Sequence, residues 1–363
     1  MFLAPKKIDW YIFRKFMGTF FVALLLIIGI VIIFDISEKI DDFVEKKAPL
    51  NAIIFDYYLN FIPYFINMYS PMFVFITVIF FTSKMASNSE IVAILSGGIS
   101  FHRMMVPYMV AAVIITILSL GLNLFVIPDA NKELVKFEQQ YTKEKPKKAS
   151  RNIHYQIAPG QFVYAESFSS WNNTAYKFTI ERIEDSKLVS KISAETAVYD
   201  TINGSWRLKK YFIREFNDDL TDDIRSGRQL DTIIPLSVKD FYFSENTVTT
   251  LNYSELNEMI RIQEMRGDAT VKHALIEKNT RFALPFSAIV LTIIGVSLSS
   301  KKRRGGIGWN IALGIALAFT YILFMRFSQM FVHTDTLSPA LALWLPNIVF
   351  ALIAIFLYRI APK

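Results

Sequence analysis

Six stretches of the chain consist almost entirely of apolar residues, and polar segments separate them. Each has about the 20 residues with which an α-helix crosses a hydrocarbon core of about 30 Å. They lie at residues 16–34, 61–83, 104–127, 282–299, 307–325 and 339–358. The pattern therefore predicts six transmembrane helices. The first stretch is too long for the apolar part of a signal peptide and has no small-residue cleavage site, so we expect it to remain as a span.

The polar ends of these stretches differ in charge. Basic residues gather at alternate ends, namely Lys6, Lys7, Arg14, Lys15, Lys84, Arg103, the run 301–304, Arg359 and Lys363. The positive-inside rule places these ends, and both chain termini, in the cytoplasm. Residues 35–59, 128–281 and 331–338 then fall on the opposite side of the membrane.

Between residues 128 and 281 the apolar positions change from a helical period to a period of two. Alternation is clearest at 154–157, 161–164, 176–183, 187–198 and 206–213, with further strands expected at 232–236 and 239–243. This pattern predicts an extramembrane all-β domain of roughly seven to nine short strands, as in a sandwich, jelly roll or open barrel.

Local signals place the connections of this β-domain. Asn203-Gly204 predicts a two-residue hairpin turn, because a type I′ turn needs positive φ twice. Helices are expected at 130–141 and at 255–265, the second capped by Ser254, and 271–279 should lead into the fourth span. The expected organisation is residues 1–127 with spans one to three, including a cytoplasmic helix within 84–103, then 128–281 as the β-domain, and 282–363 with spans four to six.

Composition agrees with a membrane protein. Hydrophobic residues make up 53% of the chain and the mean hydropathy is +0.33, more apolar surface than a soluble fold of this length needs. The formal charge of +7 sits beside apolar spans and not on a polar, aromatic-interleaved face, so nucleic acid is not an expected partner. The absence of cysteine excludes disulfides, thiolate nucleophiles and thiolate-ligated metals.

No catalytic set is visible. Neither Gly97-Gly98 nor Gly305-Gly306 is followed by the Lys-Ser/Thr pair of a P-loop, so we expect no nucleotide hydrolysis by this chain. A Gly-x-Ser-x-Gly motif is absent as well. The histidines His102, His154, His273 and His333 lie in separate segments without metal-binding spacing. We therefore expect no catalytic residue, no metal and no cofactor.

A short helix is expected at residues 88–100, between the second and third spans. Three apolar residues share one face, a carboxylate lies in the first turn near the positive end of the helix dipole, and a glycine pair ends the helix. These six candidate contact residues are Glu90, Ile91, Ile94, Leu95, Gly97 and Gly98. The features are typical of a helix that docks to a partner. Two alternatives stay open: Glu90 as an ordinary helix-start charge, and the apolar face lying on lipid.

Basic residues on the opposite side of the membrane form a second candidate set. Lys132 and Lys136 are four apart and share a helix face, and Arg326 lies about a turn and a half inside the outer end of the fifth span. A charge within a span normally faces a partner or a cavity, so the three suit phosphate or carboxylate groups of an anionic amphiphile. The alternative is snorkelling, with Arg326 paired to Asp35 or Glu38.

Two segments resemble one known family. The segment Ser-Glu-Ile-Val-Ala-Ile-Leu-Ser-Gly-Gly-Ile-Ser at 89–100 is similar to the coupling helix of the LptF/LptG family of lipopolysaccharide-export permeases. Residues 253–256 and 277–287 are similar to that family's approach to its fourth span. The order of three spans, a β-insertion and three more spans agrees as well, so the resemblance covers nearly the whole chain.

The resemblance implies a permease subunit of an ABC transporter in the inner membrane, with a periplasmic β-jelly-roll domain. Its partners would be a cytoplasmic ABC ATPase dimer, a paralogous LptF/LptG-type permease, a periplasmic LptC/LptA-type bridge protein and lipopolysaccharide. Glu90 and its helix would contact the ATPase, and Lys132, Lys136 and Arg326 match basic positions that face lipid phosphates. The acidic run at 35–40 departs from the family pattern, which speaks against a lipid role for Lys39. The motifs do not separate F-type from G-type subunits.

Two other classes fit less of the sequence. A mechanotransmitting ABC subunit, acting on envelope proteins or another lipid, also carries a periplasmic domain but usually has four spans. A membrane sensor or scaffold needs a cytoplasmic output domain, and the longest expected cytoplasmic loop has only about twenty residues.

Overall fold

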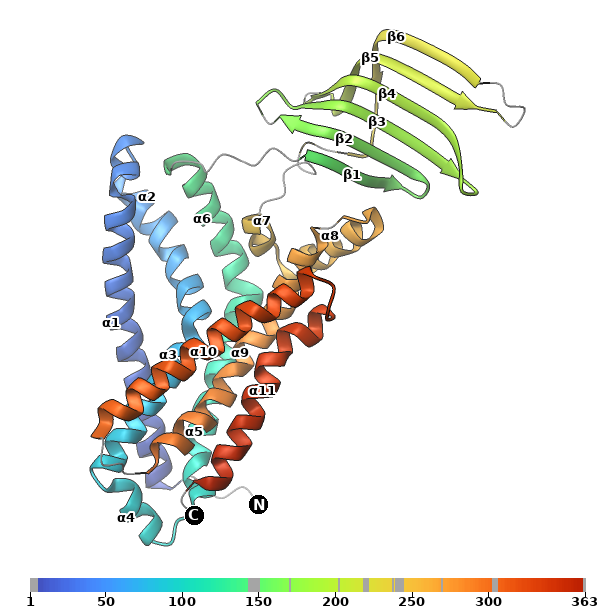
Figure 1. The fold of residues 1–363 in the computed structure, drawn as a ribbon. Coiled ribbons are helices and arrows are strands. Elements are labelled where there is room, and N and C mark those ends of the chain that lie inside the picture. The colour runs from blue at the N-terminus through green and yellow to red at the C-terminus, as the bar shows by residue number, and fades with distance from the viewer. Residues whose placement is uncertain are drawn as a thin grey trace. The chain divides into compact units, whose positions relative to one another are not determined.

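The computed structural model describes residues 6–142, 151–169, 171–201, 203–217, 222–236, 238, 245–268, 270–301 and 306–361. The chain forms two compact units (Figure 1). A helical unit comprises Met1–Lys143, Thr249–Tyr253 and Leu275–Lys363, and a β-unit comprises Glu144–Val248 and Ser254–Ala274. The β-unit is thus inserted, along the chain, between the two halves of the helical unit.

Helices carry all six predicted spans. Those of the first half are α1 (Lys7–Glu45), α2 (Leu50–Ala52), η1 (Ile53–Tyr58), α3 (Leu59–Ser87), α4 (Glu90–Ser96), α5 (Phe101–Gly121), η2 (Leu122–Val126) and α6 (Ile127–Tyr141). Those of the second half are α9 (Val271–Ser299), α10 (Gly306–His333) and α11 (Pro339–Ile360). Six helical segments of the described chain are long and apolar enough to cross a membrane, which confirms that prediction.

The third span is longer than its apolar stretch indicates. Helices α5, η2 and α6 follow one another without a break through Pro128, where the sequence pattern placed the end of the span. Segment η2 is π-helical, a local widening that changes the hydrogen-bond register just before the proline that lacks an N–H. The helix expected at 130–141 is therefore the continuation of the third span.

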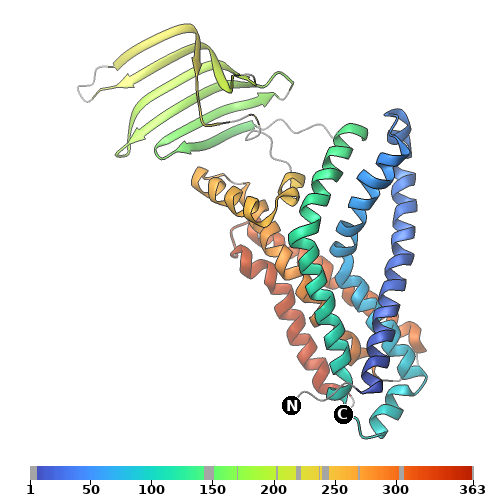
Figure 2. The ribbon, with the colours of Figure 1, turned by 180° about the vertical axis from the view of Figure 1, so that it is seen from behind.

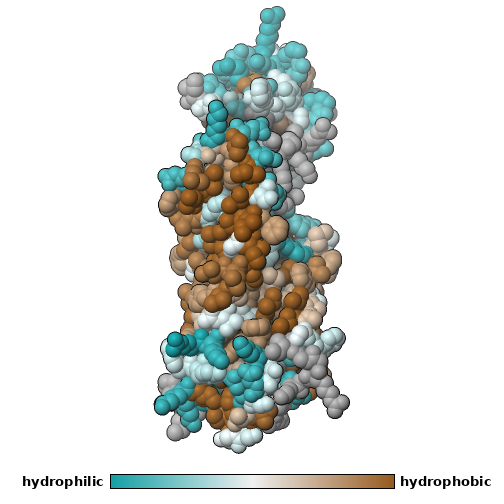
Figure 3. Space-filling view, turned by 90° about the vertical axis from the view of Figure 1, so that its left-hand side faces the viewer, coloured by the Kyte–Doolittle hydropathy of each residue, from teal (hydrophilic) through white to brown (hydrophobic). Residues whose placement is uncertain are grey.

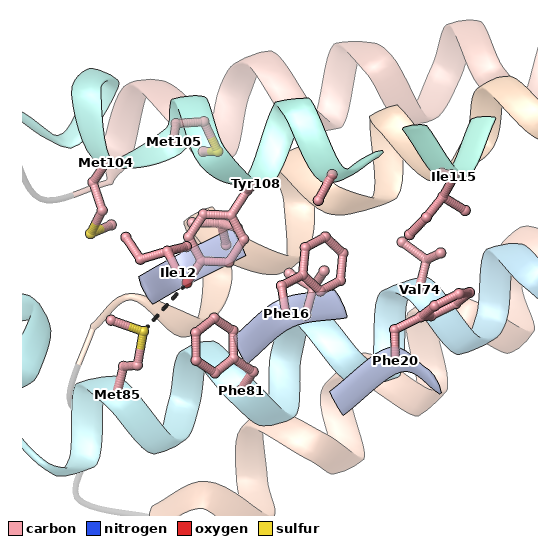
Figure 4. Close-up of a cluster of buried hydrophobic side chains, with 14 of the residues drawn as sticks. Ile12, Phe16, Phe20, Val74, Phe81, Met85, Met104, Met105, Tyr108 and Ile115 are labelled. Atoms are coloured by element: carbon pink, nitrogen blue, oxygen red, sulfur yellow. Dashed lines mark hydrogen bonds between the residues drawn. The ribbon is translucent and has the colours of Figure 1, made fainter. Parts of the chain in front are cut away.

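The two largest apolar clusters of the helical unit both include residues of α3. The first joins α1, α3, α4, α5 and α9, and Figure 4 shows Ile12 and Phe16 of α1 packed between Phe81 and Tyr108. The second joins α3, α9, α10 and α11 around Phe75, Ile79 and Tyr321. Helix α3 is therefore the central helix, and α1 and α10 both pack against it.

Close helix approach depends on two glycines. A Cβ at Gly295 of α9 would lie 2.8 Å from Val78 Cγ1, and a Cβ at Gly314 of α10 would lie 2.2 Å from Ile79 Cδ1. Both valine and isoleucine belong to α3, so small residues allow α9 and α10 to approach the central helix, as is common in membrane bundles.

Helix α1 is the least covered of the six spans. Only 17% of its most apolar window is buried, against 61% for the span that contains α3. Figure 3 looks onto this side of the molecule and shows a broad hydrophobic surface in the middle of the helical unit with hydrophilic side chains at its lower end. Phe21, Leu25, Ile33 and Phe34 of α1 are among the large exposed apolar residues. Such a surface is stable against lipid or another apolar protein surface.

The β-unit contains one antiparallel sheet whose strands follow one another in chain order, as the ribbon shows from both sides (Figures 1 and 2). The strands are β1 (Arg151–Ala158), β2 (Gln161–Ser169), β3 (Thr174–Glu184), β4 (Lys187–Asp200), β5 (Ser205–Phe216) and β6 (Asp222–Thr232). The inserted β-domain is confirmed. The described part has six long strands instead of seven to nine short ones, and this up-and-down order shows none of the crossings that a jelly roll makes.

Several sequence expectations within the β-unit need correction. Strand β6 was not predicted, and the strand expected at 232–236 ends with β6 at Thr232. The strand expected at 239–243 lies outside the described residues. The β4–β5 hairpin is present, but its loop has four residues, 201–204, with Asp200 accepting hydrogen bonds from the backbone and side chain of Asn203.

Two lysines of this sheet have a left-handed backbone conformation. Lys177 in β3 and Lys210 in β5 have φ of 46° and 49°, and both flank Glu195 of β4. The strand register is the same before and after each of them, but the irregular backbone at Lys177 changes the side-chain alternation, so that Ala175 and Phe178, three apart, are both buried. Salt bridges of 2.5 Å join Lys210 to Glu195 and Lys177 to Glu166, and Glu166 raises the pKa of Lys177.

The centre of the β-unit core is Trp206. Its indole is fully buried, stacks on Phe178 at 5.7 Å, and meets Tyr199 edge to face at 5.1 Å. The indole Nε1–H donates to the carbonyl of Leu236 at 2.7 Å, which holds the segment after β6 against the sheet. Helices α7 (Glu245–Thr250) and α8 (Tyr253–Arg266) follow, and α8 begins one residue before the expected cap at Ser254.

Candidate functional site

Helix α4 is held in place by tight turns at both of its ends. Before it, Ser89 adopts φ 60° and its N–H donates to Ala86, which ends α3 and reverses the chain within two residues. After it, Gly98 has φ 81°, the N–H of Gly98 donates to Leu95, and that of Ile99 donates to Ile94. This is a Schellman motif, in which glycine avoids the Cβ strain of the left-handed conformation. The predicted Gly97-Gly98 ending is therefore present.

The apolar face of α4 packs onto the chain itself. Ile91 is 1% exposed within the cluster that contains Phe16, Met85 and Phe101, while Ile94 and Leu95 are half-buried against the same cluster. These three residues were expected to face a partner. The exposed face is the opposite one, formed by Val92, which is 54% exposed, with Ala93, Ser96, Gly97 and Gly98.

Glu90 is also engaged within the chain. Its Oε2 accepts a hydrogen bond from the Tyr11 hydroxyl at 2.8 Å, and its Oε1 accepts one from Asn88 Nδ2 at 3.3 Å. Lys15 Nζ donates to the same Tyr11 hydroxyl at 2.7 Å. The carboxylate is thus more than a charge at a helix start, because it links α4 to the first turns of α1.

The predicted basic residues on the other end of the unit do not form one cluster of contacts. Lys132 and Lys136 of α6 make intrahelical salt bridges, to Asp129 at 3.3 Å and to Glu133 at 2.6 Å. Such exposed pairs contribute little to stability and leave the ammonium groups accessible to a ligand.

Arg326 is exposed on α10. Helix α10 packs on α3 and α11, whereas α6 packs on α3 and the π-helical segments. The expected alternative paired Arg326 with Asp35 or Glu38. In the structure Asp35 instead binds Lys39 and two tyrosines.

A polar cluster around Lys39 was not predicted as a unit. Lys39 Nζ lies 3.0 Å from Asp35 and 3.9 Å from Glu138 of α6, and it also contacts the hydroxyl of Tyr57. The hydroxyls of Tyr57 and Tyr58 donate to the two oxygens of Asp35 at 3.1 and 3.0 Å. The acidic run after the first span therefore neutralises Lys39 and fastens the end of α1 to η1 and α6.

A second missed feature is a buried chain of amides inside the bundle. Asn67 of α3 donates to Asn123 of η2 at 2.6 Å and accepts from the Ser119 hydroxyl at 2.5 Å. Asn123 in turn donates to the carbonyl of Arg281 at 3.2 Å. That carbonyl would bond the N–H of residue 285 in a regular helix, but Pro285 has none, so Asn123 replaces the missing donor.

Arg281 of α9 makes buried polar contacts that hold the segment before α8 against α9. Its side chain is 3% exposed, its Nε donates to Glu277 at 2.8 Å, and one terminal nitrogen donates to the carbonyl of Leu251 at 2.8 Å. Asn131 of α6 donates to the nearby carbonyl of Thr249 at 3.2 Å. The segment Thr249–Tyr253 is thereby fixed to α6 and α9. The sequence signal for both features was polar residues inside apolar spans, which normally have a partner there.

No chemical centre is apparent in the part of the chain that the structure describes. Among those residues there is no group of three or more histidine and carboxylate side chains that would hold a metal ion. The described chain contains a short helix, α4, with one buried and one exposed face, a bundle of apolar spans and an inserted sheet.

Comparison with known protein families agrees with this arrangement. The family described as "Lipopolysaccharide export system permease LptF/LptG" matches residues 10–360, from the first turn of α1 to the last residue of α11. No curated protein matches the chain. The chain therefore belongs to the LptF/LptG family of lipopolysaccharide export permeases.

Proposed function

We propose that this chain is one of two permease subunits of an ABC transporter that extracts lipopolysaccharide from the outer leaflet of the inner membrane. In this proposal the chain termini and α4 are cytoplasmic, and the β-unit is periplasmic and passes the lipid to a periplasmic bridge protein. A second LptF/LptG-type subunit pairs with it in the membrane. ATP is hydrolysed by a separate ATPase dimer, because this chain has no P-loop.

The observation that carries the proposal is the division of α4 into two faces. Ile91 is buried in the bundle, so α4 cannot shift without moving the helices that it touches. Val92, Ala93 and Ser96 remain exposed on the other side. A small apolar surface on a short, firmly held helix suits a groove on a cytoplasmic partner, and energy released in that partner then reaches the bundle directly.

The lipid side of the proposal rests on charge. Helix α6, which carries Lys132 and Lys136, extends to the end of the helical unit opposite α4 (Figure 1). The Lys132 side chain is partly exposed, and those of Lys136 and of Arg326 in α10 are exposed. Phosphate groups of a large anionic lipid would form charge-assisted hydrogen bonds with them, each contributing about 1.5–3 kcal/mol when partly desolvated. Lys39 has no such role in this proposal, since Asp35 and Glu138 neutralise it.

The alternative function is that of a mechanotransmitting ABC subunit, and the number of membrane spans does not favour it. Such subunits usually have four spans, whereas six helices of this chain have the length and composition of spans.

The decisive test is the charge substitution Val92→Glu. It places a carboxylate on the face proposed to enter the ATPase groove, and burying an unpaired charge there should lower ATPase co-purification by more than about tenfold. The exposed position should tolerate glutamate without loss of folding. The measurement is the amount of ATPase recovered with the affinity-tagged chain in detergent, together with lipopolysaccharide release from proteoliposomes.

The matched control is Ile233→Glu, the same kind of change at a residue of the β-unit that is 84% exposed. It should leave ATPase recovery unchanged. Full recovery of the ATPase with Val92→Glu would contradict docking through this face, and absence of any ATPase with the unaltered chain would contradict the proposed function as a whole.

The orientation of the chain gives a further prediction. Since the chain contains no cysteine, single cysteines at two exposed positions, Asn203 and Lys301, are the only thiols in their variants. An impermeant thiol reagent, added to cells with a permeabilised outer membrane, should label Asn203→Cys and spare Lys301→Cys until the inner membrane is broken. The reverse pattern would invert the proposed topology.

A further inference from the structure

Helix α4 is connected to α1 by a polar contact between residues 79 positions apart. The Tyr11 hydroxyl lies between the Glu90 carboxylate, 2.8 Å away, and the Lys15 ammonium, 2.7 Å away. Lys15 also lies over the Tyr11 ring, 4.7 Å from its centre. The hydroxyl therefore donates to one charge and accepts from the other, an arrangement that fixes its position relative to α4.

A second polar contact lies two residues earlier on α1, at Asp9. Arg103, in the first turn of α5, binds Asp9 with both terminal guanidinium nitrogens, the Nη1–Oδ1 distance being 2.7 Å. Both side chains are largely buried, at 17% and 13% exposure. Asp9 Oδ2 also accepts from the N–H of Lys6, which fixes the start of α1. A bidentate pair of this kind resists sliding and rotation of the two helices.

Apolar packing connects the same elements. Ile12 and Phe16, which follow Tyr11 on α1, are buried in one cluster with Ile91 of α4 and Met104 of α5. Figure 4 shows Ile12 and Phe16 among the side chains of α3 and α5, with Tyr108 reaching toward Met85. The first three turns of α1 therefore move with α4 and α5 as one body.

Beyond Leu24 the apolar contacts of α1 become fewer: Ile27 and Ile28 are partly buried against the same cluster, and Ile32 is partly buried against the cluster around Phe43. The buried apolar residues of α1 are Ile12, Phe16, Phe20 and Leu24, and the next is Phe43 near its other end. A displacement of α4 therefore reaches α1 at its first turns and is little opposed along the middle of the helix.

We propose that Tyr11 and Asp9 are positioning residues that transmit the displacement of α4 to α1. The inference rests on the proposed function, in which α4 receives the ATPase. Tyr11 carries the motion through the Glu90 carboxylate, and Asp9 carries it through Arg103. The ATPase cycle thereby tilts α1, the span with the smallest buried share among the six, and lipid movement follows that tilt.

The test is Tyr11→Phe, which removes the hydroxyl and keeps the ring. Because the exposed face of α4 is unchanged, the ATPase should co-purify at the unaltered yield and still hydrolyse ATP. The amount of lipopolysaccharide released per ATP hydrolysed should fall by about tenfold. This is the size of effect expected from the loss of one hydrogen bond to a charged group. A purely structural defect would instead lower assembly and hydrolysis together.

Tyr358→Phe is the matched control. It removes a hydroxyl at the same end of the unit, 3.1 Å from His102 Nδ1, where α11 and not α1 meets α5. Its lipid release per ATP should equal that of the unaltered chain.

The second contact has its own test. Asp9→Arg should lower lipid release per ATP, and Asp9→Arg combined with Arg103→Asp should restore most of it by remaking the pair with reversed charge. Unchanged release per ATP in Tyr11→Phe, or no rescue by the charge exchange, would overturn the inference while ATPase docking stands. Failure of the unaltered chain to bind the ATPase would instead remove the proposed function itself.

Discussion

Replacing Arg281 with alanine is expected to destabilise the helical unit by about 3 kcal/mol, since removal of one member of a buried ion pair leaves the other charge uncompensated. The Glu277 carboxylate would lose its partner at 2.8 Å, and the carbonyl of Leu251 would lose its donor. The same change frees the segment Thr249–Tyr253 from α9, so the effect should also appear as faster hydrogen exchange there.

The matched control for this prediction is Arg326→Ala. Arg326 is also an arginine within a span, but it is exposed, so its loss should change stability by less than about 0.5 kcal/mol. Equilibrium unfolding in mixed micelles compares the two variants directly. Equal midpoints would show that Arg281 does not stabilise the junction.

In the β-unit, Trp206→Ala is expected to cost about 3–5 kcal/mol, the range for truncating a large buried aromatic side chain. The indole is completely buried, and its loss leaves a cavity beside Phe178 and an unpaired carbonyl at Leu236. Because the two units have separate cores, unfolding should begin in the β-unit while the helices persist.

Hydrogen exchange of the full chain measures this effect strand by strand. Protection of β3, β4 and β5 should fall together, and protection of α3 should not change. Trp171→Ala is the control, because that ring is 96% exposed and buries almost no surface in the chain. Similar protection in both variants would contradict the assigned role of Trp206.

The transmembrane helices were the most predictable part of this structure. A span must satisfy its backbone internally and face lipid, so its length and apolar composition are visible in the sequence. What those rules do not include is the behaviour of a helix beyond the membrane. Residues 128–141 are polar enough to suggest a new element, yet the π-helical turn before Pro128 lets the third span continue through them.

The β-unit was less predictable for two physical reasons. Strand β6 reads as Asp-Asp-Ile-Arg-Ser-Gly-Arg-Gln-Leu-Asp-Thr and exposes most of its residues, so its alternation of apolar and polar positions is weak. The left-handed conformation of Lys177 and Lys210 could not be predicted either, because lysine has no preference for positive φ. Their conformation depends on the paired strands around them.

At the candidate site, the sequence predicted the helix and its apolar face but not what that face touches. Helical spacing brings Ile91, Ile94 and Leu95 together whether they pack on this chain or on another. Only the tertiary structure shows the bundle beneath them and Tyr11 beside Glu90. Contacts between residues so far apart in sequence leave no periodic trace in either segment.

Because α1 is long, a small rotation at one of its ends produces a large displacement at the other. With 39 residues it is about 58 Å long, roughly twice the thickness of the hydrocarbon core. Treated as a rigid lever that pivots near Leu24, it would convert a rotation of about 5° into a displacement of about 2–3 Å at Val44, some 30 Å away. The Lys39–Asp35 side of that lever makes hydrogen bonds that fail when stretched by less than about 1 Å. The packed arm, from Leu24 to Lys7, is about 25 Å long and would move by about 2 Å in the opposite direction, so the motion of α4 that drives α1 would also release its far end from η1 and α6.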